Sequence, residues 1–198
     1  MVHENLPEIY NFVYQCYEDN SNLFFGEDTL SSLEGVQQGD PMGPFLFSLA
    51  VMDIIRNMKS DLNIWYLDDG TIAGNVKTVL NDYKEILKAL SSHGLEVNPF
   101  KCELFLIKPQ SEDCINALSS FREISEEMKL VEKENLTLLG APIFPEAIDN
   151  VLEAKLENLK LMPSRLTQID NHQALFLLRN CFGMPKLTYF LSSYDQKF

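Results

Sequence analysis

Basic residues are scarce in this sequence. Its 198 residues include 16 Lys and Arg against 29 Asp and Glu, which gives a formal net charge of −13 and a pI near 4.6. Proteins that bind nucleic acid normally carry a basic face, because phosphate groups repel an acidic surface. The imbalance is local: residues 1–145 hold 10 basic and 23 acidic side chains, whereas residues 146–198 hold 6 of each. The C-terminal part is therefore the part that repels a phosphate backbone least.

Closely spaced cysteines, a secretory leader and a membrane-length apolar run are also missing. The four cysteines lie far apart, so their spacing indicates neither a zinc site nor a disulfide framework. We therefore expect a reducing, intracellular location, either cytoplasmic or nuclear. The N-terminus has no basic region followed by an apolar core, which argues against a secretory signal. The longest uncharged run, residues 41–52, is shorter than the ~20 residues that span a bilayer, so no membrane association is expected.

The sequence does contain enough apolar material for a folded interior. Hydrophobic residues make up 45% of the chain and aromatic residues 11%, which suits a globular protein with one full core or two small lobes. Apolar residues recur at helical spacing in some segments and alternate in others. Helices are predicted over residues 7–17, 45–58, 76–92, 147–161 and 170–179, and from residue 186 onward. Strands are predicted over residues 23–25, 29–32, 63–67, 71–73, 96–98 and 103–107. The acidic residues 111–133 are expected to be a weakly helical surface insertion.

Capping residues mark two of these helices. Asn75 can cap the N-terminus of the helix over residues 76–92, and Gly94 stands where a helix commonly ends in a left-handed residue. Asp170, with Gln173 three residues later, resembles a capping box. These signals fix the expected ends of the two helices.

Asp68, Asp69 and Gly70 lie between two segments with strand character, residues 63–67 and 71–73. An Asp-Gly step in this setting predicts a tight hairpin turn. Two neighbouring carboxylates repel each other unless a cation, a proton or water compensates their charge. Carboxylate oxygens held at a fixed spacing suit a divalent metal such as Mg²⁺. A solvated surface turn is the simpler interpretation when the pair is taken alone.

Residues 35–44 are the second unusual segment. They place three glycines and two prolines around Gln37 and Gln38 and lead directly into the apolar helix predicted over residues 45–58. Glycine permits close approach of the backbone to a ligand, and the first N–H groups of the helix face the loop. An ordinary loop-to-helix join accounts for these residues one by one. It does not account for their order in a chain that also contains residues 66–69, Tyr-Leu-Asp-Asp.

Together, the two segments resemble the palm of reverse transcriptases, most closely those of non-LTR retrotransposons. Residues 38–41, Gln-Gly-Asp-Pro, look like the family's loop that positions template and nucleotide, and residues 66–69 look like its metal-binding hairpin. The resemblance covers nearly the whole chain, from the middle of the palm into the thumb. It implies an α+β fold in which residues 1–145 form a partial palm, an antiparallel sheet backed by helices, with a primer-grip-like hairpin over residues 136–143. Residues 146–198 would then begin a helical thumb.

The resemblance also implies an activity, that of an RNA-directed DNA polymerase that adds deoxynucleotides by two-metal nucleotidyl transfer. The cofactor would be Mg²⁺ or Mn²⁺, and the partners would be an RNA template, a DNA primer and deoxynucleoside triphosphates. Lys101 follows an Asn-Pro step like that of the family, with Phe100 inserted, and is the candidate general acid for the leaving pyrophosphate. A surface lysine at a strand start is the alternative. The other implied roles are metal binding and catalysis by Asp68 and Asp69, substrate binding by Gln38, Gly39, Pro41 and Tyr66, and a primer grip at Leu139 and Gly140.

One feature of the family is not found in this sequence. The first metal-binding Asp of a reverse transcriptase lies in a strand upstream of the loop that residues 35–44 resemble. None of the Asp or Glu side chains in residues 1–34 stands in such a strand with an aromatic residue a few positions on. The fingers lobe is missing as well. We therefore expect a fragment that begins just after that motif and is inactive by itself.

Two other interpretations stay open. A non-catalytic relic of a retrotransposon, or a module that binds a partner, would retain the motifs without the activity. Translation of the sequence encoded upstream of Met1 would separate these from an enzyme. A viral-type RNA polymerase is less favoured, because that family usually has Gly before the Asp pair and lacks the Gln-Gly-Asp-Pro loop. The sequence does not indicate an oligomeric state.

Overall fold

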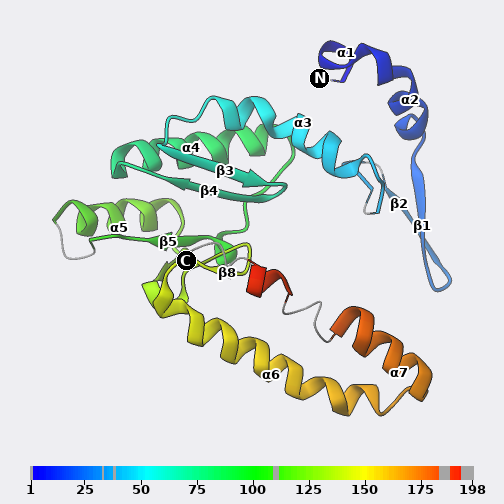
Figure 1. The fold of residues 1–198 in the computed structure, drawn as a ribbon. Coiled ribbons are helices and arrows are strands. Elements are labelled where there is room, and N and C mark those ends of the chain that lie inside the picture. The colour runs from blue at the N-terminus through cyan, green and yellow to red at the C-terminus, as the bar shows by residue number, and fades with distance from the viewer. Residues whose placement is uncertain (1, 33, 38, 109–111, 183–187, 193–198) are drawn as a thin grey trace. The chain divides into compact units, whose positions relative to one another are not determined.

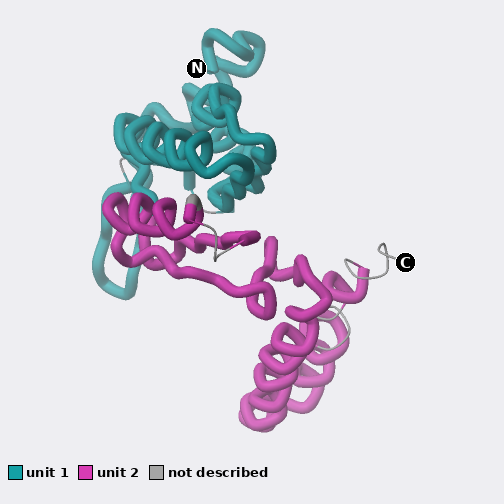
Figure 2. The backbone as a smooth tube through the Cα atoms, turned by 90° about the vertical axis from the view of Figure 1, so that its left-hand side faces the viewer, with its two compact units in different colours: residues 1–97 teal, residues 98–198 magenta. Residues whose placement is uncertain are grey.

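The protein is α+β, as predicted, and forms two compact units. A computed structural model describes residues 2–32, 34–37, 39–108, 112–182 and 188–192, apart from the side chain of Asp113. The units are Met1–Val97 and Asn98–Phe198 (Figure 2). The predicted boundary between a palm part and a thumb part at residue 145 falls inside the second unit. That boundary concerns function and stays a prediction.

The first unit joins helices to two antiparallel hairpins (Figure 1). Its described helices are α1 (Val2–Asn5), α2 (Pro7–Tyr17), α3 (Gly43–Arg56) and α4 (Val76–Ser92), and its described strands are β1 (Ser21–Phe25), β2 (Asp28–Ser32), β3 (Leu62–Tyr66) and β4 (Asp69–Ala73). The helices predicted over residues 7–17 and 76–92 are confirmed. The one predicted over residues 45–58 begins two residues earlier, because a helix accepts Pro44 in its first turn, where a missing N–H costs no hydrogen bond.

The core of the first unit lies between α3, α4 and the β3–β4 hairpin. Val51 from α3 and Ile86 and Leu90 from α4 are its buried centre. The partly buried side chains around this centre come from α3 and the loop after it, both strands of the hairpin and the segment after α4: Phe47, Ile54, Ile55, Met58, Trp65, Ile72, Leu95 and Val97. The prediction that two helices back the Asp68 hairpin is therefore confirmed.

A buried carboxylate joins α4 to the loop between α3 and β3. One oxygen of Asp82 accepts hydrogen bonds from the Lys59 N–H at 2.9 Å, the Ser60 N–H at 2.7 Å and the Ser60 hydroxyl at 2.5 Å. Burial alone would raise the pKa of Asp82, but these hydrogen bonds hold that pKa below its ordinary value. Asp82 thus fixes the loop that leads into the hairpin.

The predicted caps are present at both helices. The Asn75 side chain accepts from the Lys77 N–H at 3.0 Å, and Gly94 has a φ of 74° just after α4. In the second unit, the Asp170 side chain accepts from the His172 N–H at 2.9 Å and begins α7. Short polar side chains therefore satisfy helix N–H groups that have no partner within the helix.

The second unit contains short strands and longer helices. Its described strands are β5 (Glu103–Phe105), β6 (Lys129–Val131), β7 (Thr137–Leu138) and β8 (Ala141–Pro142), and its described helices are α5 (Glu112–Ile124), α6 (Ile148–Leu166), α7 (Asn171–Leu177) and a π-helical turn over Leu178–Phe182. Residues 188–192 are also helical, whereas the predicted helix start at Lys186 lies outside the described residues. The predicted hairpin over residues 136–143 is confirmed as β7 and β8.

One prediction is wrong. The Asp68 hairpin does not share a single antiparallel sheet with residues 96–98 and 103–107. Asn98 accepts a hydrogen bond from the Phe100 N–H at 3.1 Å and caps a 3₁₀ turn over Pro99–Lys101, so the chain turns before a strand can form. β5 instead pairs in parallel with β6. Parallel strands need a long crossover, which α5 supplies. Residues 111–133, expected to be a surface insertion, therefore contain this crossover helix, with Ala117 and Phe121 buried.

No helix among the residues that the structure describes is long and apolar enough to cross a membrane.

Candidate active site

The two aspartates lie at the end of the β3–β4 hairpin. Tyr66 pairs with Asp69, so Leu67 and Asp68 form the two-residue turn and Leu67 has a φ of 55°. The sequence pattern placed the turn at Asp69-Gly70, two positions too late. Asp69 and Gly70 instead begin β4. Both carboxylates lie on the exposed surface of the hairpin.

Gly70 is needed for packing across the hairpin rather than for its turn. It pairs with Trp65, and a Cβ atom built on Gly70 would lie 2.6 Å from two ring carbons of Trp65. The indole therefore occupies the space where a side chain at position 70 would stand. The Trp65 ring N–H donates to Asn63 at 2.8 Å, and Asn63 in turn donates to the carbonyl of Ile55 in α3. The aspartate-bearing hairpin is thereby fixed to the core.

We expect Gly70→Ala to lower the free energy of unfolding by about 1–3 kcal/mol, because the added methyl group overpacks the hairpin and displaces Trp65. Trp65 is the protein's one tryptophan, so its emission spectrum reports the displacement directly. Urea unfolding followed by circular dichroism gives the stability change. In a Trp65→Leu background the same substitution should cost much less, and an equal cost in both backgrounds would contradict the steric explanation.

The loop before α3 is closed by its own backbone. The Asp40 N–H donates to the Gln37 carbonyl at 3.2 Å, and the Gly43 N–H donates to the Asp40 carbonyl at 3.0 Å. Gly39 has a φ of 91°, a conformation that side chains disfavour. One oxygen of the Asp40 side chain accepts from the Met42 N–H at 2.9 Å. These contacts hold Gln37, Asp40 and Gly43 close together ahead of the helix.

Two side chains, from the last residue of α2 and the first residue of β1, hold this loop from outside. The Tyr17 hydroxyl donates to the second oxygen of Asp40, and the Gln37 side chain donates to the Ser21 hydroxyl. The bonds from Tyr17 and Met42 lower the pKa of Asp40. Burial and the same bond to Asp40 raise the pKa of Tyr17. The Asp40 carboxylate is therefore engaged within the protein and is not an open ligand.

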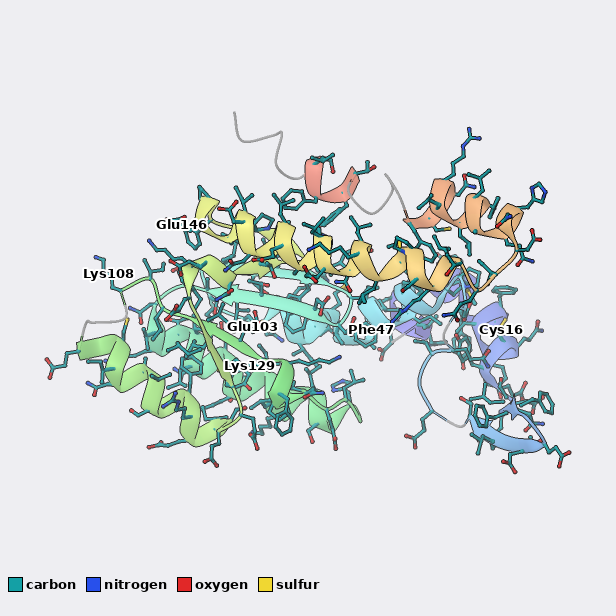
Figure 3. All side chains as sticks on the ribbon, turned by 90° about the horizontal axis from the view of Figure 1, so that it is seen from below. Cys16, Phe47, Glu103, Lys108, Lys129 and Glu146 are labelled. Carbon is teal, nitrogen blue, oxygen red and sulfur yellow. The ribbon has the colours of Figure 1, made fainter. Side chains whose placement is uncertain are left out.

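The loop and the aspartate turn meet at one pocket of about 460 Å³. Gln37, Gly39 and Asp40 line it from the loop, and Leu67 and Asp68 line it from the hairpin turn. Phe47, labelled on α3 in Figure 3, lies at this pocket and also packs against the core. Two segments that are 24 or more residues apart in the sequence thus share one site, with the Asp68 carboxylate in its lining.

The other predicted site residues belong to both units. Tyr66 is 63% exposed and, with Asp69, lies on the face of the hairpin opposite Trp65. Pro41 is exposed in the loop, and Gln38 lies outside the described residues. Three more belong to the second unit: Lys101 is exposed in the 3₁₀ turn, and Leu139 and Gly140 form the turn between β7 and β8 with φ values of 51° and 77°.

Residues 3–143 match the model of the family described as reverse transcriptase (RNA-dependent DNA polymerase). The chain belongs to the reverse transcriptase family. The match includes the loop, the aspartate hairpin and the β7–β8 hairpin of this reverse transcriptase segment. The comparisons with curated proteins and with solved structures give no significant match.

Sequence reasoning did not find Tyr17 and Ser21, the two residues of this reverse transcriptase segment that hold the loop. Tyr17 is the last residue of the helix predicted over residues 7–17, and its aromatic ring carries no sign that its hydroxyl has a partner 23 residues later. Ser21 stands just before the strand predicted over residues 23–25. Only the fold brings these side chains to the loop, so no local pattern could have found them.

Proposed function

We propose that this chain is the palm-derived part of an RNA-directed DNA polymerase of the non-LTR retrotransposon type. The observation that supports this proposal is the shared pocket, because it joins the loop of residues 37–43 to the turn that carries Asp68. A polymerase needs a metal-binding carboxylate beside a surface that positions the templating base and the incoming nucleotide. Asp68 and this loop form such a pair.

Asp68 and Asp69 are the residues that would hold Mg²⁺ or Mn²⁺. Exposed carboxylate oxygens are ligands that these ions prefer, and Mg²⁺ commonly uses one or two carboxylates and takes its other ligands from substrate phosphates and water. Asp40 is engaged by Tyr17 and Met42. Over the described parts of the chain, no three His, Cys, Asp or Glu side chains are grouped to hold a metal ion. When bound, the metal would stabilise charge at the reacting phosphate.

The remaining roles follow the family resemblance. The backbone of Gly39, with Gln38 and Pro41 beside it, would position template and deoxynucleoside triphosphate. Tyr66, on the open face of the hairpin, would contact the substrate, and Leu139 with Gly140 would hold the primer. Lys101 would protonate the leaving pyrophosphate. Residues 146–198 would begin the thumb, and the cysteine spacing favours an intracellular location, cytoplasmic or nuclear.

The 198 residues alone are proposed to be inactive. Two-metal transfer uses carboxylates that bind both ions, and among the residues that the structure describes no third His, Cys, Asp or Glu is grouped with Asp68 and Asp69. A complete site would need a third carboxylate.

Metal titration tests the assignment of the site. We expect Mg²⁺ to bind in the millimolar range at best, because two carboxylates without substrate phosphate leave most of its coordination shell to water. Asp68→Asn should weaken binding further. The measurement is a calorimetric titration, supported by Tb³⁺ luminescence sensitised by Trp65 in the same hairpin. Asp53→Asn, an exposed change on α3, is the matched control. Equal isotherms for the wild type and Asp68→Asn would show that the pair is not the metal site.

A further inference from the structure

One hydroxyl group holds both ends of the turn that forms the loop side of the pocket. The Tyr17 hydroxyl donates to the Asp40 side chain. Burial and that bond raise the pKa of Tyr17, whereas a hydrogen bond from the Gln37 N–H to the same hydroxyl lowers it. Gln37 and Asp40 both line the pocket, and Tyr17 is not among the described residues of its lining. Tyr17 therefore acts on the pocket from behind, through two loop residues.

The turn that Tyr17 holds carries an open stretch of backbone. Gly39 lies between Gln37 and Asp40, has a φ of 91° and lines the pocket. No described atom beyond its chain neighbours lies within 4 Å of the position that a Gly39 Cβ would take. A glycine in such a position lets a ligand approach the main chain closely. The place of this backbone in the pocket depends on the residues at either side, which are the two that Tyr17 contacts.

The described lining of the pocket contributes negative charge and no cation. Asp40 and Asp68 belong to it, and none of its described members is Lys, Arg or His. Carboxylates repel an anionic ligand, and more strongly at shorter distance. Both oxygens of Asp40 are occupied, one by the Met42 N–H at 2.9 Å and the other by Tyr17. Asp68 is exposed and is thus the carboxylate of this lining that can reach a metal ion.

We infer that Tyr17 is a positioning residue for the nucleotide site. Its hydroxyl keeps the Asp40 carboxylate bound within the protein and keeps the turn around Gly39 in its place opposite Asp68. Without that hydroxyl, one Asp40 oxygen loses its donor, and the described lining holds no cation to replace it. The role assigned to Tyr17 rests on the proposed function, in which this loop positions a deoxynucleoside triphosphate.

Amide exchange in the ligand-free protein tests whether Tyr17 holds the loop. In Tyr17→Phe, the Met42 and Gly43 amides should exchange with water about tenfold faster, the factor expected for loss of one hydrogen bond to a charged group. NMR on ¹⁵N-labelled protein measures the rates, and unchanged rates in α4 show that the fold is intact. Tyr14→Phe is the matched control, because it removes a hydroxyl from the same helix whose bond, at 3.0 Å, goes to Glu18 and not to the loop.

Nucleotide affinity is the second measurement. The probe is deoxyadenosine triphosphate with Mg²⁺, titrated into the same labelled protein while the Gly39 and Gly43 amide signals are followed. Tyr17→Phe should weaken binding about fivefold, the effect of one net hydrogen bond, and Tyr14→Phe should bind as the wild type does. Wild-type loop signals that do not respond to the nucleotide would contradict the proposed function. The exchange rates, measured without nucleotide, judge the hold of Tyr17 on the loop separately.

A double variant shows whether Tyr17 acts through Asp40. When Asp40 is already replaced by alanine, Tyr17→Phe should change the loop exchange rates and the nucleotide affinity much less than it does in the wild type. Equal changes in both backgrounds would overturn the inference, because Tyr17 would then act through packing of its ring. Loop exchange rates in Tyr17→Phe equal to those in Tyr14→Phe would overturn it as well.

Discussion

The 198-residue protein is expected to extend no primer on an RNA template, with either Mg²⁺ or Mn²⁺. Two-metal transfer requires that one ion activate the primer hydroxyl while the other takes the leaving oxygen, and the two ions need shared carboxylate ligands. Asp68 and Asp69 are neighbours at one turn, and Asp40 is engaged by Tyr17. Positioning and electrostatic stabilisation supply most of the rate in such reactions. The loss should therefore be of many orders of magnitude rather than a few-fold.

Primer extension with labelled product on a gel is the measurement. Asp68→Ala with Asp69→Ala serves as the blank, and an active reverse transcriptase on the same primer and template shows that the substrate is competent. The acidic first unit adds a second reason for low activity, because it repels the phosphate backbone. Products made by the wild type and absent from the double variant would contradict the prediction and would mean that these residues complete the site.

Local signals in the sequence predicted the elements of the first unit well. The helices Pro7–Tyr17 and Val76–Ser92 follow from apolar residues at three- and four-residue spacing, and Asn75 and Gly94 fix the ends of the second. The packing of α3 and α4 against the Asp68 hairpin also followed, because both helices and the hairpin have apolar faces to cover. Such features depend on neighbours within a few residues, which is what a sequence pattern records.

Pairing between distant segments was not predictable in the same way. The antiparallel sheet expected around residues 103–107 required β5 to pair with the aspartate hairpin, whereas β5 pairs in parallel with β6 across α5. The turn residue Asn98 and the crossover helix decide this outcome, and neither changes the apolar alternation in β5 itself. Similarly, Gly70 suggested a turn, although its absent side chain makes room for Trp65.

In the candidate site, too, local motifs were predictable from the sequence, whereas contacts between distant segments were not. The loop and the aspartate hairpin were recognised as motifs, and their shared pocket agrees with the expectation that they act together. The contacts of Tyr17 and Ser21 with the loop depend on tertiary placement, so no local pattern indicates them. A family motif thus pointed to the candidate site, while the residues that hold the loop required the structure.

Asp82→Ala should lower the free energy of unfolding by about 3 kcal/mol at neutral pH, because it leaves two backbone N–H groups and the buried Ser60 hydroxyl without their acceptor. Urea unfolding followed by Trp65 fluorescence measures this, since Trp65 lies in the same unit. Asp53→Ala, which removes an exposed carboxylate from α3, is the control and should change stability by less than about 0.5 kcal/mol.

The stability difference between wild type and Asp82→Ala should also depend on pH. The pKa of Asp82 is lowered in the folded protein, so its carboxylate stabilises the fold fully above the ordinary Asp pKa of about 4. That contribution is lost as the pH falls through the lower folded pKa, where protonation removes the charge that accepts the three hydrogen bonds. The wild type and the variant should therefore converge in acid. A difference that stays constant from neutral pH to well below pH 4 would show that Asp82 stabilises the protein through packing rather than through its charge.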